Sequence, residues 1–117
     1  MQFLSVDLVF RNGAGAISST MSENLTSNEF DIRNQSGCGI QFKYTGAPEG
    51  TMTVESTCDD PSGTQNWVTV TGSSVTVTGE GDWVYNIVSN NTGFVRLSYA
   101  FSSGTGTITA KIIIKGI

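Results

Sequence analysis

The stretch that decides the fold runs from Cys38 to Cys58 and reads C-G-I-Q-F-K-Y-T-G-A-P-E-G-T-M-T-V-E-S-T-C. Apolar and polar residues alternate on both sides of its centre, and the segment Gly46 to Gly50 between them has turn composition. Alternation places every second side chain on one face of a β-strand. The stretch therefore predicts two β-strands joined by a tight turn.

A hairpin centred on Pro48 gives these two strands a definite register. The pairs predicted on one face are Tyr44 with Met52, Phe42 with Val54, Ile40 with Ser56, and Cys38 with Cys58. The opposite face carries polar residues, among them Lys43 and Glu55. Because one face is apolar and the other is polar, we expect an antiparallel pair with one side toward water.

Two further hairpins are predicted toward the C-terminus. In one of them, Ser103-Gly104 is a two-residue turn between two apolar faces. Its predicted pairs are Phe101 with Gly106, Tyr99 with Ile108, Leu97 with Ala110, and Val95 with Ile112. A shorter hairpin joins residues 67–71 to residues 75–78 about Gly72-Ser73. Each hairpin presents an apolar face that a second layer must cover.

The composition of the whole chain agrees with these segments. Of its 117 residues, 43 are Gly, Ser or Thr, which suits strands and turns and is poor in helix formers. Strand patterns recur at about 8–12-residue spacing, with no helix long enough to cover a sheet. We predict a single all-β domain over residues 1–117, an antiparallel two-sheet sandwich of eight to nine strands. The pattern leaves a jelly-roll-like and an immunoglobulin-like strand order open.

Residues 12–28 depart from the alternation, because they are polar and hold few apolar anchors. We predict an extended arm or loop there, with one short helical turn around residues 22–25. The residues before it alternate and are predicted to form a first strand, not a signal peptide. Since the pattern assigns no core partner to the arm, we expect it to contact another protein.

Histidine is absent, and 6 Lys+Arg stand against 10 Asp+Glu, for a net charge of −4. Without histidine, the commonest general base and metal ligand are missing. Scattered cations and an acidic balance argue against nucleic acid and anionic membranes as partners. No apolar run approaches the roughly 18 residues of a membrane span. We therefore expect no enzyme activity, no cofactor, no metal site, and no nucleic-acid or membrane partner.

Cys38 and Cys58 are the only cysteines in the chain. In the predicted register they lie opposite each other, close to bridging distance. A structural disulfide between them is one prediction, and two reduced thiols are the alternative. Cytosolic synthesis leaves thiols reduced at first, so their state reports on environment more than on function.

Acidic residues gather in two loops, at Asp59-Asp60 and at Glu80-Gly-Asp82. Neither loop matches the spaced ligand set of a calcium-binding loop, so we interpret these residues as solvated turn residues. A hydrolase that worked through Asp59, Asp60 or Asp82 would need a cleft that brings two of these carboxylates together.

Three aromatic residues are candidates for an exposed rim or interface. Trp67 and Trp83 begin predicted strands near the rim of the sandwich, and they would form a sugar-stacking platform if exposed and coplanar. Phe94 and Ile113 fall on faces opposite to their neighbours' core positions. Several exposed apolar residues on one sheet would mark a subunit interface.

Residues 95–107 read V-R-L-S-Y-A-F-S-S-G-T-G-T, and they follow N-W-V-T-V-T-G-S-S at 66–74 and G-E-G-D-W-V-Y-N-I at 79–87. Together with K-I-I-I-K-G at 111–116, these segments resemble small β-sandwich structural proteins of tailed bacteriophages. The resemblance covers roughly the second half of the chain. Its motifs are hairpin and core positions and contain no catalytic signature.

This resemblance implies a virion component. The first expectation is a capsid decoration (cement) protein, which stabilises the shell by bridging subunits of the major capsid protein. The alternatives are a tail adaptor or a tail-fibre or receptor-binding domain, and, from another class, a carbohydrate-binding β-sandwich module. Decoration proteins of this type are commonly trimers, so the resemblance implies a homotrimer on the capsid exterior, made in the host cytoplasm.

Overall fold

The computed structural model describes residues 3–31, 35–59, 62–87 and 93–116. These residues form eleven β-strands and no helix, so they contain no helix that could cross a membrane. The strands are β1 (Phe3–Asp7), β2 (Phe10–Asn12), β3 (Leu25–Ser27), β4 (Phe30–Asp31), β5 (Gln35–Gly46), β6 (Glu49–Thr57), β7 (Val68–Thr69), β8 (Val75–Thr78), β9 (Gly81–Ile87), β10 (Phe94–Ser103) and β11 (Gly106–Gly116). The prediction of an all-β fold is confirmed.

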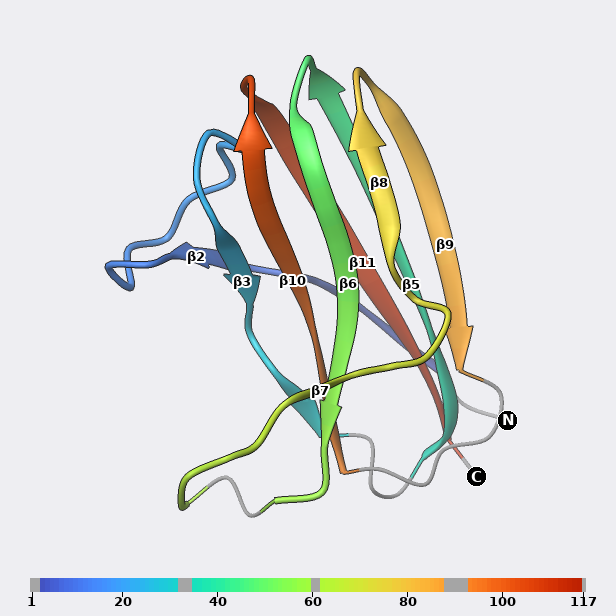
Figure 1. Cartoon of the computed structure of the whole chain (residues 1–117). Coiled ribbons are helices and arrows are strands. Elements are labelled where there is room, and N and C mark those ends of the chain that lie inside the picture. Colours follow the sequence, from blue (N-terminus) through green and yellow to red (C-terminus); the bar gives the residue numbers. More distant parts are fainter. Residues whose placement is uncertain (1–2, 32–34, 60–61, 88–92, 117) are drawn as a thin grey trace.

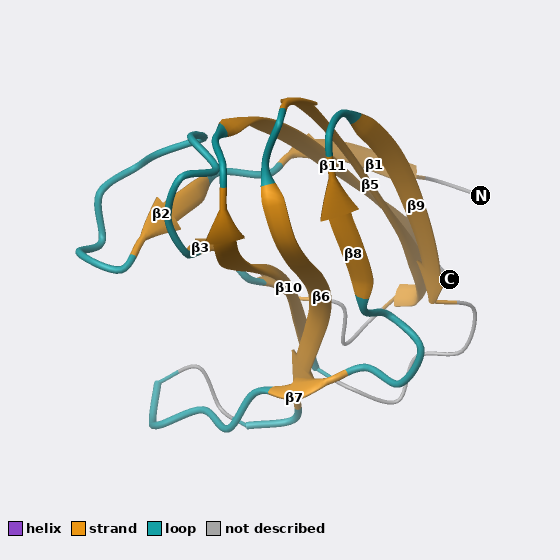
Figure 2. Cartoon of the chain, turned by 45° about the horizontal axis from the view of Figure 1, so that its top comes forward, coloured by secondary structure: helices purple, strands orange, loops and turns teal. Residues whose placement is uncertain are grey.

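The strands form two antiparallel sheets that pack face to face (Figure 1). The four-stranded sheet has the order β1-β11-β5-β9. The seven-stranded sheet follows β2-β3-β10-β6-β7, with β4 beside β10 and β8 beside β6. Consecutive strands pass from one sheet to the other at β5 to β6, β8 to β9 and β10 to β11, as Figure 2 also shows. This order is that of a jelly roll, so the predicted sandwich takes the first of its two open topologies.

The three predicted hairpins are wrong in their strand partners. β5 pairs with β11 and β9, so that Phe42 lies beside Ala110 and Trp83. β6 pairs with β10, so that Val54 lies beside Leu97. The strands β7 and β8 both pair with β6 and not with each other. Two strands with a short connection can fold over each other as an arch between sheets, and alternation alone does not distinguish an arch from a hairpin.

Three two-residue connections cross between the sheets at the same end of the sandwich, which we call the arch end (Figure 1). They are Ala47-Pro48, Gly79-Glu80 and Gly104-Thr105. A Cβ atom on Gly104, which has a φ of 76°, would lie 2.1 Å from the carbonyl oxygen of Ala47. Glycine is therefore required where the β10–β11 connection meets the β5–β6 connection.

The core lies between the inner faces of the two sheets. Its buried residues alternate along the long strands and include Ile40, Phe42, Met52, Val54, Leu97, Tyr99, Ile108, Ala110 and Ile112. All of these were assigned to inward faces from the sequence pattern. The inward faces are therefore confirmed, although the strands that carry them have other neighbours than predicted.

The segment 12–28 is attached to the core, contrary to the expectation that it has no core partner. Met21 and Leu25 are 0% and 1% exposed. The backbone N–H of Met21 donates to the carbonyl oxygen of Gly106 at 2.8 Å, and Leu25 opens β3. No helical turn forms at 22–25. Two apolar anchors are enough to hold this polar segment along the edge of the sandwich, and two residues four apart do not distinguish a strand from a helix.

Candidate functional site

Cys38 and Cys58 belong to different sheets, so the geometric argument for a disulfide between them is wrong. Cys38 lies on β5 of the four-stranded sheet, whereas Cys58 follows the end of β6 in the seven-stranded sheet. Both are thiols in the structure, Cys38 buried and Cys58 exposed. Burial raises the pKa of the Cys38 thiol to about 11, which keeps it protonated and unreactive near neutral pH.

Trp67 lies over the outer face of the seven-stranded sheet and is half-buried. The guanidinium carbon of Arg96 lies 4.2 Å from the centroid of its ring. The Arg96 Nε donates to Glu55 Oε1 at 2.8 Å across the β10–β6 pair. A cation–π contact backed by an ion pair thus fixes the segment before β7 against the sheet.

Trp83 packs on the inner side of β9 in the other sheet. Its ring centroid lies 5.0 Å from that of Phe42 and 5.5 Å from that of Tyr85, with the Tyr85 ring at 14° to it. The Tyr85 hydroxyl donates to the carbonyl oxygen of Thr71 at 3.3 Å. Trp67 and Trp83 therefore have different environments on different sheets, and each is engaged by its own aromatic or cationic neighbour.

Phe94 does not have the exposure that its sequence position predicts, because only 6% of it is accessible. It opens β10, where Thr57 of β6 and Asp31 of β4 flank it on both sides. A residue between two flanking strands at the start of a third loses its contact with water. Ile113, by contrast, is 40% exposed as predicted, and Val84 on β9 of the same sheet is 55% exposed.

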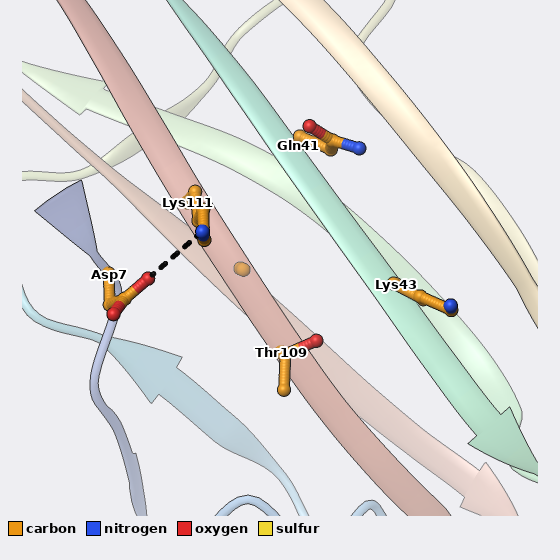
Figure 3. Close-up of a pocket in the computed structure, with 6 residues that line it drawn as sticks. Asp7, Gln41, Lys43, Thr109 and Lys111 are labelled. Atoms are coloured by element: carbon orange, nitrogen blue, oxygen red, sulfur yellow. Dashed lines mark ion pairs between the residues drawn. The ribbon is translucent and has the colours of Figure 1, made fainter. Parts of the chain in front are cut away.

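The outer face of the four-stranded sheet carries a shallow hollow of about 260 Å³ (Figure 3). The labelled lining residues come from β1, β5 and β11: Asp7, Gln41, Lys43, Thr109 and Lys111. The Lys111 Nζ lies 3.9 Å from Asp7 Oδ1. Both side chains are mostly exposed, so this ion pair adds little stability and its groups are available to a partner.

Sequence reasoning placed Lys43 on a polar strand face but did not bring the residues of this hollow together. Gln41 and Lys43 alternate with core residues on β5, and Thr109 and Lys111 do so on β11. Their adjacency follows from the pairing of β5 with β11, in which Gln41 stands beside Lys111 and Lys43 beside Thr109. The hairpin prediction assigned these strands other partners and so separated the residues.

The loop carboxylates are placed as structural and surface groups. Asp59 Oδ2 accepts the backbone N–H of Asn66 at 2.6 Å and the Thr57 hydroxyl at 3.2 Å, so it closes the loop after β6. Asp82 stands beside Lys43 on the other sheet, near the arch end. The structure thus places Asp59 and Asp82 apart, and Asp60 lies outside the described residues. In the described part of the chain, no three His, Cys, Asp or Glu side chains converge on a possible metal site.

Fold and surface together define a jelly-roll β-sandwich with a polar sheet face that holds two exposed apolar residues. No protein-family model matches the sequence, and no curated protein is similar to it.

Solved structures nevertheless share the fold. The SPBc2 prophage-derived protein YomS matches with a TM-score of 0.54 and 15% identity, over 97% of this chain and 95% of that chain. The enzymatically active domain of tailspike protein 4 of bacteriophage CBA120 matches with a TM-score of 0.53 and 9% identity, over 98% of this chain and 19% of that chain. PirA matches with a TM-score of 0.50 and 14% identity, over 94% of this chain and 92% of that chain. The chain thus has a β-sandwich fold that phage-derived proteins also have, at low sequence identity.

Proposed function

We propose that the chain is a virion structural protein of a tailed bacteriophage, and within that class a capsid decoration (cement) protein that bridges subunits of the major capsid protein. The outer face of the four-stranded sheet carries the proposal. It combines exposed Ile113 and Val84 with the hollow lined by Asp7, Lys43 and Lys111. Exposed apolar residues bordered by mixed charges are typical of a surface that binds another protein.

Cement activity requires binding and no reaction. A protein that binds only the assembled shell stabilises it by mass action. Lys43 and Lys111 beside Asp7 and Asp82 offer both charge signs within one face, which favours a single docking orientation. The net charge of −4 supports a protein shell over packaged DNA as the surface that is bound. We further propose a homotrimer on the capsid exterior, without enzyme activity.

The phage origin is supported by the likeness to YomS, which extends over nearly the whole of both chains. The likeness to a tailspike domain favours a second candidate, a tail adaptor or a tail-fibre domain. Both candidates belong to the virion and differ in location. A carbohydrate-binding module is the candidate from another class, but the two indoles named for it, Trp67 and Trp83, pack against different sheets and form no common platform.

The test is to localise the protein on purified particles of the phage that encodes it and to measure head stability without it. We expect copies on the head surface, heads that lose integrity at lower temperature when the gene is deleted, and rescue by the purified protein. Ile113→Asp should abolish rescue, whereas Val68→Asp, at a valine of the other sheet that is 56% exposed against 40% for Ile113, should retain it. Density only at the tail would select the adaptor or fibre role. Glycan binding without particle association would select the carbohydrate-binding role.

A further inference from the structure

β9 is an edge strand with an unprotected hydrogen-bonding side. Within the described residues, β5 is the only strand that pairs with it, and no other backbone hydrogen bond reaches it (Figure 2). Its seven residues run in unbroken register with β5, so alternate N–H and C=O groups point away from the sheet. Edge strands are usually shortened, bulged or protected by charged residues or proline, and Asp82 near one end is the only such feature of β9.

We propose that β9 pairs antiparallel with β9 of a second copy about a two-fold axis through Val84, which joins the two four-stranded sheets into one continuous sheet. A two-fold contact requires a strand that matches itself when reversed. With Val84 on the axis, all seven residues find a partner, Val84 meets Val84 of the second copy, and Trp83 meets Tyr85 of the second copy. A register centred on Asp82 would instead bring two carboxylates together and leave most of β9 unpaired.

Burial and chemistry both favour this self-pairing. Val84 is 55% exposed on the outer face, and in the pair it covers its own symmetry mate, at a Cβ separation of about 5 Å. Trp83 and Tyr85 are half-buried on the inner face and already stack in parallel fashion. Across the axis they gain a second aromatic neighbour, and cross-strand aromatic pairs are among the stabilising contacts of sheets.

The charge pattern also suits a second copy of this chain. Asp82 is the only charged residue of β9, and Lys43 stands beside it on β5. In the Val84-centred register each Asp82 is opposite position 86, so the two aspartates lie on either side of the axis and apart. The contact between the two β9 strands therefore brings no like charges together, although each copy carries a net charge of −4.

The pairing can be tested apart from the proposed capsid role. Val84 lies on the face proposed to bind the capsid, but the pairing uses the backbone of β9, whereas Ile113, Asp7 and Lys111 lie two or more strands away from that edge. A failure of capsid binding would thus leave the two-fold contact standing, and the reverse also holds. Combined with the proposed homotrimer, the two-fold contact predicts a hexamer made of two trimers in solution, and without the trimer it predicts a dimer.

The experiment is sedimentation equilibrium and native mass spectrometry of the full chain and of Val84→Lys. We expect the wild type to form an assembly with an even number of copies. Val84→Lys places two ammonium groups on the axis and should raise the dissociation constant about tenfold or more. The matched control is Val68→Lys, because Val68 is 56% exposed on β7 of the other sheet and should leave association unchanged. Thermal melting by circular dichroism verifies that both variants fold.

A charge-complementation experiment makes the test specific to Val84. An equal mixture of Val84→Lys and Val84→Glu should restore the association that each variant lacks alone, because opposite charges then meet on the axis. Alternate β9 amides should exchange slowly in the wild type and faster in Val84→Lys. A wild type that stays a single copy or forms only an odd-numbered assembly would overturn the proposal. So would a Val84→Lys variant with wild-type association, or a mixture without restored association.

Discussion

The backbone N–H of Ala47 donates to the carbonyl oxygen of Thr105 at 2.9 Å. This hydrogen bond joins the β5–β6 arch to the β10–β11 arch, which are far apart in the sequence. Gly104 and Gly106 make the approach possible, because a Cβ on Gly104 would lie 2.1 Å from the Ala47 carbonyl oxygen and a Cβ on Gly106 would lie 2.1 Å from the Thr45 carbonyl oxygen of β5. The two connections therefore meet backbone against backbone at Gly104, and the Pro48 ring lies beside Gly106.

This close approach predicts a large difference between two glycine substitutions. Gly104→Ala should lower the free energy of unfolding by roughly 3 kcal/mol or more, because its Cβ collides with the Ala47 carbonyl and its φ is 76°. Gly72→Ala is the matched control, with a φ of 81° and no atom within 4 Å of the new Cβ. It should cost about 1–2 kcal/mol from backbone strain alone. Urea denaturation measures both, and equal losses would contradict the packing argument.

A buried serine holds the connection between β7 and β8 onto β6. Ser73 is fully buried, and its Oγ accepts the Val54 N–H at 3.1 Å and donates to the Val70 carbonyl oxygen at 2.6 Å. Ser73→Ala leaves the Val54 N–H without this acceptor and should cost about 1–3 kcal/mol of stability. Ser74→Ala, at the exposed neighbour, should change stability by less than about 0.5 kcal/mol. Thermal melts of the two variants test this, and matching melting temperatures would refute it.

Stability should decrease in alkaline solution because of Cys38. Burial raises the pKa of this thiol from its ordinary value of 9.0 to about 11 in the folded chain. Below pH 9 the Cys38 thiol is neutral in both the folded and the unfolded chain, so its ionisation does not lower the free energy of unfolding. Between pH 9 and 11 the unfolded chain loses the proton while the folded chain keeps it, so unfolding becomes easier by an amount on the order of 2 kcal/mol.

The measurement is urea denaturation at a series of pH values for the wild type and Cys38→Ala. The difference between the two stabilities should shrink as the pH rises through this window. Tyr99, whose pKa is also raised by burial and by Glu49, contributes equally to both chains and cancels in the difference. A difference that is constant with pH would show that Cys38 ionises equally in both states.

The Arg96–Trp67 contact should appear as a measurable coupling energy. A double-mutant cycle with Arg96→Gln and Trp67→Leu is expected to give about 0.5–1 kcal/mol, since the guanidinium is held over the ring by Glu55. The control cycle uses Lys111→Gln and Asp7→Asn, whose exposed ion pair should give a coupling near zero. Similar couplings in both cycles would argue against the cation–π contribution.

Inward and outward faces followed from the sequence, because a strand pattern with a period of two encodes them directly. Phe42 and Val54 were predicted to face the core, and both are fully buried. Their neighbours were not predicted, since a hairpin and an arch bury the same residues and differ only in which backbone groups bond. Side-chain pattern carries little information on that choice when the connection is two residues long.

In the candidate site, too, strand faces could be predicted from the sequence and strand neighbours could not. Lys43 was predicted on a polar face, but it lines the same hollow as Lys111 only because β5 pairs with β11, more than half the chain away. Phe94 was misassigned because strict alternation fails at the start of β10, where Phe94 and Val95 are both buried. The local sequence pattern contains no information about flanking strands that come from distant segments of the chain.

The strand order has a consequence for synthesis. β11 lies between β1 and β5, and β10 lies between β3 and β6, so each sheet has an inner strand that leaves the ribosome after all its neighbours. Until then, β5 and β6 lack a principal partner on one side and expose apolar faces to aggregation or proteolysis. A nascent chain that stops before β10 lacks an inner strand of each sheet, so neither sheet can form completely. Translation that ends early therefore yields fragments for degradation, and only chains that extend through β11 are competent to assemble.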